Sequence, residues 1–188
     1  AERLAADKPD GEPMRVLFLV PSISLLSQSL REWSAQCELD LRSFAVCSDA
    51  KVSKQRAEND LQDMSTHDLA LPATTDGATL LAQMRAPKAE GKAGLEVVFS
   101  TYQSIQAVHE AQQAGAGEFD LVICDEAHRT TGVTLAGENE SYFVKVHDNA
   151  YLRANRRLYM TATPRLFDDN VKSTAKDNDA ELCSMDDE

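Results

Sequence analysis

LVICDEAHRTTG, residues 121–132, joins a run of apolar residues directly to two adjacent carboxylates, Asp125 and Glu126. A continuous apolar run of this kind is typical of a strand that is covered on both faces, as in a parallel sheet. Polar residues often mark the end of such a strand, so the acid pair alone indicates no more than a strand end. Two carboxylates at that position can also form a site, because one can hold Mg²⁺ while the next orients a water for attack on a phosphate. The surrounding sequence decides between these two interpretations.

Apolar strands and helical patterns alternate on both sides of this stretch. Strands are predicted at residues 15–20, 40–48, 95–100, 119–124 and 157–163, and helices at 22–33, 75–86, 101–115 and around 148–155. The polar residues 49–73 give no clear pattern, apart from an extended segment around Pro72. This alternation predicts an α/β fold with a mostly parallel sheet and helices on both faces. In such sheets the functional residues gather at the carboxyl ends of the strands.

The composition is that of a globular domain. With 188 residues, 43% hydrophobic and 27% charged, the chain is long enough for one domain with a sizeable core. It contains neither a run of 18 apolar residues nor a basic and then apolar leader, so no transmembrane helix or signal peptide is predicted. The four cysteines form no CxxC pair, which argues against a zinc site and favours a reduced, cytoplasmic setting.

The net charge of −12 is unevenly distributed along the chain. Residues 168–188 hold eight acids and two lysines, which is half of the net negative charge. We expect this acidic tail to be poorly ordered. The rest of the chain is only mildly acidic, so its charge does not exclude a local groove for nucleic acid.

Three further motifs lie at predicted strand ends. VPSISLLSQ (20–28) precedes the acid pair, STYQSI (100–105) lies between them, and MTATP (160–164) follows, with Thr161 36 residues beyond Asp125. Each motif is weak alone, but four of them in this order form a specific signature. The acid pair is therefore interpreted as part of a site.

Together these motifs resemble the first RecA-like domain of a superfamily-2 helicase or translocase. VPSISLLSQ resembles motif Ia, STYQSI the region of motifs Ib and Ic, DEAH motif II, and TAT the commoner SAT of motif III. The closest resemblance is to the motor of type ISP restriction-modification enzymes and related bacterial predicted helicases, in SISLLSQSLREW, CDEAHRTTG, KVHDN and RRLYMTATPRLF. It covers residues 14 to 188 and implies an ATP- and Mg²⁺-dependent DNA motor of the bacterial cytoplasm.

The resemblance also implies roles for individual residues. Asp125 would coordinate Mg²⁺, Glu126 would act as the general base, and His128 would link the nucleotide state to motif III, where Thr161 and Thr163 supply coupling hydroxyls. Contacts with the backbone of double- or single-stranded DNA are implied for five residues near helix starts: Ser22, Gln28, Ser100, Thr101 and Gln103. Helix N-termini offer free N–H groups to phosphate, although the same residue types are also ordinary caps.

One motif of this family is not found. Its ATPases carry a GxxxxGK[ST] loop upstream of motif Ia; the chain has no such sequence, and GKAG at 91–94 lacks the spacing and the Ser or Thr. We therefore expect a fragment of a parent ATPase, with a flexible leader (1–13), a partial RecA-like domain (14–167) and an acidic tail (168–188) that leads towards a missing second RecA-like domain. Alone it should bind ATP and Mg²⁺ poorly and be inactive. Without the strand of the phosphate-binding loop, residues 157–163 would form an open apolar edge that favours non-native self-association.

Two other interpretations share features with this one. A non-catalytic RecA-like module that binds nucleic acid or a partner would have the same fold, and an RNA-acting DEAH helicase would have the same acid box. Retention of both DEAH and TAT favours the ATPase fragment over the binding module. The match to CDEAHRTTG and MTATPRLF favours DNA over RNA.

Overall fold

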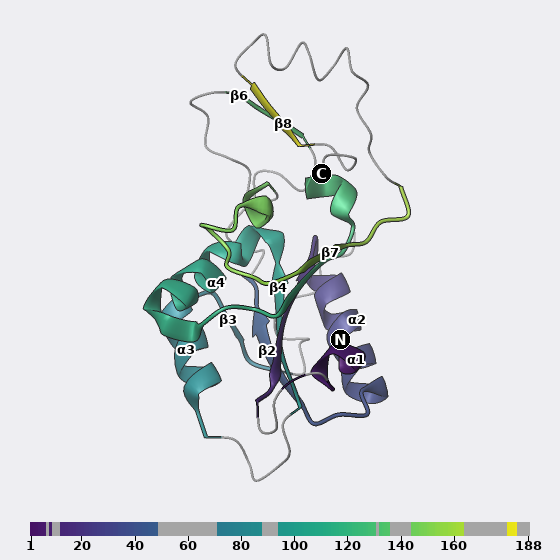
Figure 1. Ribbon diagram of the computed structural model, residues 1–188, viewed down its shortest axis with the longest axis vertical. Coiled ribbons are helices and arrows are strands. Elements are labelled where there is room, and N and C mark those ends of the chain that lie inside the picture. The colour runs from purple at the N-terminus through teal and green to yellow at the C-terminus, as the bar shows by residue number, and fades with distance from the viewer. Residues whose placement is uncertain are drawn as a thin grey trace.

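The computed structural model describes residues 1–6, 8, 12–48, 71–87, 94–130, 132–135, 144–163 and 180–183. Its centre is a six-stranded sheet in the order β3-β2-β4-β1-β5-β7, in which every pair of neighbours is parallel (Figure 1). The strands are β1 (Met14–Val20), β2 (Leu41–Val46), β3 (Ala73–Thr74), β4 (Leu95–Thr101), β5 (Leu121–Cys124) and β7 (Arg157–Tyr159). The predicted parallel α/β sheet is confirmed.

Helices cover both faces of this sheet. On one face lies α2 (Ile23–Gln36), with the short α1 (Glu2–Ala5) beside it, and on the other lie α3 (Gly77–Arg85) and α4 (Ile105–Ala111) (Figure 1). The start of α2 is fixed by Ser22, whose side chain accepts a hydrogen bond from the Leu25 amide at 3.4 Å. The predicted placement of helices on both faces is thus also confirmed.

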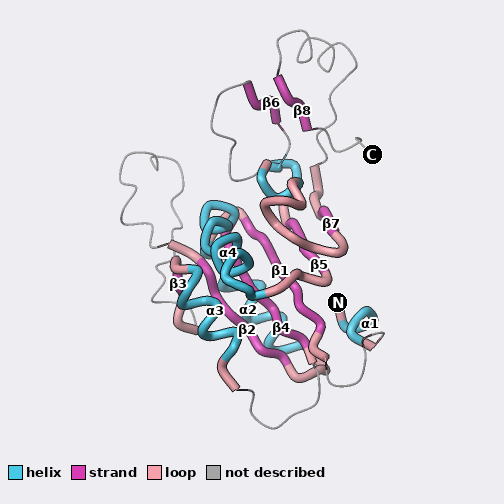
Figure 2. Tube along the Cα trace, turned by 60° about the vertical axis from the view of Figure 1, so that its left-hand side comes forward, coloured by secondary structure: helices cyan, strands magenta, loops and turns pink. Residues whose placement is uncertain are grey.

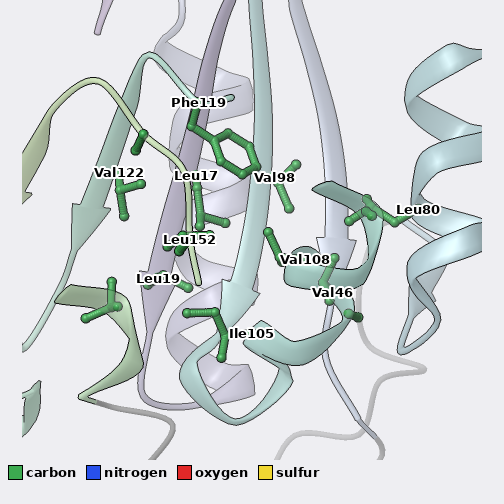
Figure 3. Close-up of a cluster of buried hydrophobic side chains, with 14 of the residues drawn as sticks. Leu17, Leu19, Val46, Leu80, Val98, Ile105, Val108, Phe119, Val122 and Leu152 are labelled. Carbon is green, nitrogen blue, oxygen red and sulfur yellow. The ribbon is translucent and has the colours of Figure 1, made fainter. Parts of the chain in front are cut away.

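The central strand β1 shows why its sequence is a continuous apolar run. Leu17 and Leu19 pack into the core under α3 and α4 (Figure 3), whereas Val16, Phe18 and Val20 pack into the core under α2. All five are buried. Successive side chains of a strand point to opposite faces, so a strand between two helix layers needs apolar residues at every position. Each such side chain contributes about 1.5–3 kcal/mol on burial.

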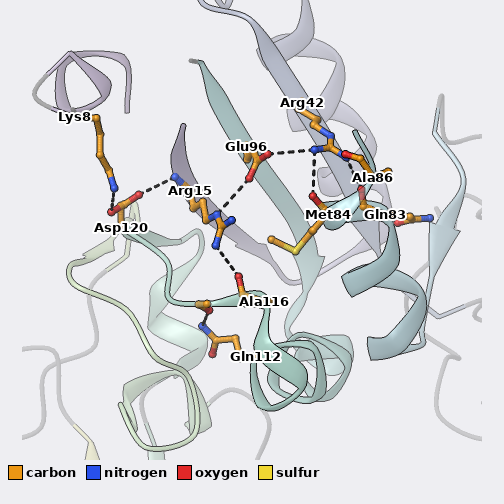
Figure 4. Close-up of polar contacts among 11 residues, drawn as sticks. Lys8, Arg15, Arg42, Gln83, Met84, Ala86, Glu96, Gln112, Ala116 and Asp120 are labelled. Atoms are coloured by element: carbon orange, nitrogen blue, oxygen red, sulfur yellow. Dashed lines mark hydrogen bonds and ion pairs between the residues drawn. The ribbon is translucent and has the colours of Figure 1, made fainter. Parts of the chain in front are cut away.

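A buried polar network lies at the end of the sheet where the parallel strands begin. Glu96 on β4 is only 3% exposed and accepts hydrogen bonds from Arg15 on β1 and Arg42 on β2, both at 3.3 Å (Figure 4). Arg15 also donates to the carbonyl of Ala116 at 2.7 Å. Arg42 donates to three carbonyls at the end of α3, those of Gln83, Met84 and Ala86. The network binds the end of α3 and the turn that ends at Ala116 to the sheet. It does not involve the carboxyl ends of the strands.

The predicted helix at 101–115 is divided into three parts. A 3-10 turn, η3 (Tyr102–Ser104), leads into α4, which ends in a wide π-turn, η4 (Gln112–Ala116). The π-turn accommodates the buried side chain of Gln112, which donates to the carbonyls of Gly117 and Arg153 at 3.0 and 2.8 Å. Gly115, at φ +97°, adopts a conformation that suits glycine.

The helix predicted around residues 148–155 is wrong. The structure has a single 3-10 turn there, η6 (Lys145–His147), followed by turns and irregular chain. The guanidinium of Arg157 donates to the carbonyls of Val146 and Leu152. These carbonyls are satisfied by a side chain from β7, so the segment packs without forming a helical ladder.

The two expected terminal segments contain regular structure. In the tail 168–188, Ala180–Cys183 forms β8, which pairs antiparallel with β6 (Gly132–Leu135) beyond the carboxyl ends of the main sheet (Figure 2). Poor order was therefore the wrong expectation for these four residues, whose backbone is paired; the rest of the tail lies outside the described residues. In the leader 1–13, α1 is held where Glu2 accepts a hydrogen bond from the Glu38 amide at 2.8 Å.

Strand β7 lies at an edge of the sheet and pairs, within the described residues, with β5 alone. It is shorter than the predicted strand 157–163: the strand ends at Tyr159, and the backbone of Met160 extends the hydrogen bonding by one residue. Leu158 is 46% exposed and Tyr159 38% exposed, although both are large apolar side chains. The expectation of an apolar edge at this strand is therefore confirmed.

Candidate functional site

The carboxyl ends of four neighbouring strands lie level with one another. In the register of the sheet, Val20 of β1 is opposite Thr101 of β4, and Cys124 of β5 is opposite both Leu19 of β1 and Tyr159 of β7. The residues that follow these strands therefore meet along one edge. All four motifs found in the sequence begin at this edge, as the parallel topology requires.

The acid pair begins the turn that follows β5. The Asp125 amide donates to the carbonyl of Leu19 at 2.9 Å, and the Asp125 carbonyl accepts from the Tyr102 hydroxyl at 2.8 Å. Oδ1 of Asp125 accepts from the amide of Glu126, also at 2.9 Å. Glu126 has φ +50° and is the one residue other than glycine, in the described part of the chain, in the left-handed region. This conformation costs roughly 1–2 kcal/mol for a residue with a Cβ, so it persists only where neighbouring contacts hold it.

The backbones of the DEAH and TAT motifs are joined directly. The Met160 amide donates to the carbonyl of Cys124, and the Ala127 amide donates to the carbonyl of Met160, at 2.9 and 2.8 Å. These two bonds continue the pairing of β5 and β7 past the last strand residues. They place the first residues of η5 (Ala127–Thr130) beside the TAT motif.

His128 brings the side chains of the two motifs together. Its Nδ1 lies 3.0 Å from Oγ1 of Thr161 and 3.4 Å from Oγ1 of Thr163. The same nitrogen lies 3.3 Å from Oε2 of Glu126. One imidazole nitrogen is thus within reach of both threonine hydroxyls and of a carboxylate, so its tautomer depends on which of them it bonds.

Three of the five residues suggested for nucleic-acid contact lie at the surface or partly at it. Ser22, half-buried, caps α2 by accepting from the Leu25 amide. Gln28 is exposed nearly two turns further along α2 and donates to Glu32 at 2.9 Å. Gln103 is exposed in η3. Ser22 and Gln103 follow the ends of β1 and β4, and so belong to the same edge as the acids.

The other two residues of this set are inside the domain. Ser100 is buried, and its hydroxyl donates to the carbonyl of Thr101 at 3.0 Å. Thr101 is also buried, and its hydroxyl donates to that of Ser104 at 3.1 Å. In this conformation their hydroxyls shape the turn between β4 and α4 instead of reaching a ligand.

The oxygen donors at this edge suit a hard cation only in part. Asp125 offers Oδ2, which accepts no hydrogen bond from the described residues. Among those residues, no group of three or more His, Cys, Asp or Glu side chains is arranged to hold a metal. Mg²⁺ is commonly held by one or two carboxylates together with phosphate oxygens and water, and a lone Asp125 fits that pattern. Burial raises the pKa of the Cys124 thiol to about 12.

Tyr102 is the site residue that the sequence did not reveal. It is fully buried at the start of the segment predicted as a helix at 101–115, yet its hydroxyl bonds the backbone carbonyl of the first acid. The available signal was the residue type, since a buried tyrosine, unlike phenylalanine, requires a partner for its hydroxyl.

Two cavities of about 470 and 460 Å³ lie against α2 and include none of the candidate site residues. The candidate site therefore lies at the exposed carboxyl ends of the strands and not in either of these cavities. In the described part of the chain, no helix combines the length and the apolar character needed to cross a membrane.

The fold and this edge together define a RecA-like α/β domain of the kind found in helicase motors. The family model of the type III restriction enzyme, res subunit (ResIII) matches residues 2–166, and the chain belongs to this family. No curated protein is significantly similar to it.

Two solved structures of type ISP restriction-modification enzymes are similar to the chain. One is a nuclease-deletion mutant of LlaGI in complex with a DNA substrate mimic, with 39% identity and a TM-score of 0.68. The other is the ATP-dependent enzyme LlaBIII bound to DNA, with 42% identity and a TM-score of 0.70. The matches cover 100% and 99% of this chain, but 13% and 12% of the two enzymes. The chain thus spans about an eighth of the length of either enzyme.

Proposed function

We propose that this chain is the first motor lobe of an ATP-dependent DNA translocase of the restriction-modification type. The observation that carries the proposal is the contact between the acid pair and the TAT motif, in which His128 lies within hydrogen-bond distance of Glu126 and Thr161. A structural strand end has no need of such a contact. This contact suits a mechanism in which a change of the nucleotide bound at the acids alters the position of the TAT motif after the neighbouring strand.

In this proposal the two acids have separate tasks. Asp125 would hold Mg²⁺, and the ion would supply neutralisation of phosphate charge. Glu126 leaves the backbone in another direction because of its positive φ, and orients and deprotonates the attacking water. His128 reports the position of Glu126 to Thr161 and Thr163.

The grip on the phosphates is proposed to come from another part of a larger protein. The sequence contains no GxxxxGK[ST] loop, and both similar enzymes are about eight times longer than the matched region. Their DNA complexes support DNA as the polymer on which the motor acts. Ser22, Gln28 and Gln103 are the proposed direct contacts to its backbone, while Ser100 and Thr101 shape the turn that presents Gln103.

A second RecA-like lobe would face the same edge and close it over the nucleotide. The open position of the acids and the exposure of Glu126, 39% for its side chain, are consistent with that arrangement. A non-catalytic binding module would require none of the contacts between His128 and the TAT motif, so we place it second.

The test is a Glu126→Gln substitution in the complete protein. General bases contribute typically about 10²- to 10⁴-fold, so DNA-stimulated ATP hydrolysis should fall by that order, while nucleotide binding is retained. Hydrolysis is followed by phosphate release and binding by calorimetry.

The matched control for this experiment is Glu110→Gln. Glu110 is an exposed residue of α4 that accepts a hydrogen bond from Gln106 at 3.1 Å, and it lies outside the candidate site. The control should keep the wild-type rate. Near-normal turnover in Glu126→Gln would remove Glu126 from the role of base, and a wild-type protein without ATPase activity would contradict the motor itself.

A further inference from the structure

The peptide unit between Asp125 and Glu126 is held at both of its polar groups. Its carbonyl accepts from the Tyr102 hydroxyl at 2.8 Å, and its N–H donates to Oδ1 of Asp125 at 2.9 Å. The next rotatable bond along the chain sets the φ of +50° at Glu126. Fixing this peptide plane therefore fixes the N–Cα axis about which the Glu126 side chain is oriented.

Tyr102 reaches this peptide from another strand. It follows β4, whereas the acids follow β5, and β1 lies between these two strands in the sheet. Its side chain is 0% exposed, so the ring is held by packing on all sides. The bond to Asp125 thus crosses the width of a strand and is made by a rigid group.

The Tyr102 hydroxyl donates to the Asp125 carbonyl in this structure. Burial raises the pKa of Tyr102 far above its usual range, and the neighbouring Cys124 thiol, with which the hydroxyl is hydrogen-bonded, raises it further. The pKa of Cys124 is itself raised by burial, so both groups stay neutral. A buried hydroxyl needs hydrogen-bond partners, and the carbonyl of Asp125 accepts its proton at 2.8 Å.

Tyr102 is also the first residue of η3, the turn proposed to face nucleic acid. The next residue, Gln103, is exposed, and the turn is braced by the hydrogen bond between the hydroxyls of Thr101 and Ser104. A displacement of Gln103 would move the backbone of Tyr102, and the packed ring would carry that movement to Asp125.

We propose that Tyr102 is a positioning residue, which aims the Glu126 carboxylate by holding the Asp125–Glu126 peptide and links this peptide to the η3 turn. The inference rests on the proposed function, in which Glu126 is the base and Gln103 touches DNA. This positioning role depends on the Tyr102 hydroxyl. A purely structural role would depend on the ring, which fills the core with or without the hydroxyl.

The first test is Tyr102→Phe in the complete protein, which removes the hydroxyl and keeps the ring. Small misplacements of a reacting group cost up to about 10²-fold, so the kcat of DNA-stimulated hydrolysis should fall roughly 10- to 100-fold, with the KM for ATP unchanged. The factor by which DNA stimulates hydrolysis should fall as well. A wild-type kcat, or an unchanged stimulation factor, would overturn the proposal.

The matched control is Tyr151→Phe. The Tyr151 hydroxyl donates to Oε1 of Gln106 at 2.7 Å, so this variant also loses one hydroxyl contact in the same domain, away from the acids. Its kcat and its stimulation by DNA should equal those of the wild type. An equal loss in both variants would assign the effect to general weakening of the domain and would overturn the proposal.

A second readout is independent of activity. In the 188-residue chain, the three-bond coupling between HN and Hα of Glu126 reports its φ, and Tyr102→Phe should change it while Tyr151→Phe should not. An unchanged coupling in Tyr102→Phe would contradict the positioning role even in a protein without ATPase activity. Conversely, a protein in which Glu126→Gln abolishes hydrolysis and Tyr102→Phe behaves as wild type would retain the proposed function and lose this inference.

Discussion

Glu96 is the buried carboxylate on which two arginines converge, at the end of β4 opposite the candidate site. Removing one member of a buried ionic group leaves the remaining charges uncompensated. Glu96→Ala should therefore lower the free energy of unfolding by about 3 kcal/mol, at the low end for buried pairs because Arg15 and Arg42 are partly exposed. Urea denaturation of the chain measures this. Glu110→Ala, on the exposed face of α4, is the control, and a loss no greater than in that control would contradict the role given to the network.

Which single residues meet at the site could be predicted in part from the sequence. The grouping of Asp125, Glu126, His128 and Thr161 follows from parallel strands that end at one edge, and the structure brings these residues together. The burial of Thr101 could not be predicted, because the direction of a side chain after a strand depends on the turn that follows. The positive φ of Glu126 also has no local signature, since the contacts that hold it come from residues distant in the sequence.

At the scale of elements, the strands and most helices could be predicted because their apolar spacing matches the two-layered core. The failures have specific causes. Residues 148–155 have helical spacing, but Arg157 takes up the carbonyl of Leu152 within them and that of Val146 just before them. Strand β8 is formed by pairing with β6, about 48 residues earlier in the chain. Contacts from outside a segment decided both outcomes, and a local pattern does not contain them.

The exposed edge strand β7 leads to a prediction on association. The chain should self-associate through this edge, because within the described residues β7 is paired on one side, with β5, and exposes Leu158 and Tyr159, which makes it a template for pairing. Leu158→Lys should shift the chain towards monomer, since charged residues on an edge oppose pairing. Sedimentation velocity over a range of concentrations measures this, with Gln113→Lys at an exposed position of η4 as the equal change of charge elsewhere. A wild-type chain that stays monomeric throughout the range would argue against an adhesive edge.

For the molecule as a whole, the division of labour proposed above predicts weak nucleotide binding. The acids and coupling hydroxyls are present in the chain, but its sequence has no loop to cradle phosphates. The 188-residue chain should therefore bind ATP·Mg²⁺ no more tightly than about 1 mM, which corresponds to about −4 kcal/mol. Isothermal calorimetry tests this, with Asp125→Asn as the comparison for any heat that arises at the acids. Submillimolar affinity that disappears in Asp125→Asn would contradict the prediction.

The order of strands in the sheet also governs how the chain is made. The first strand, β1, lies at the centre, between β4 and β5, and β2 likewise pairs with β4. Met14 therefore cannot pair until Leu95, its partner in the register, has been synthesised. At translation rates of about 5–20 residues per second, this wait lasts roughly 5–15 seconds, during which two strands have left the ribosome without their central neighbour. The emergence of β4 is thus the event that turns the nascent polypeptide into a sheet, and the apolar residues of β1 need protection until then.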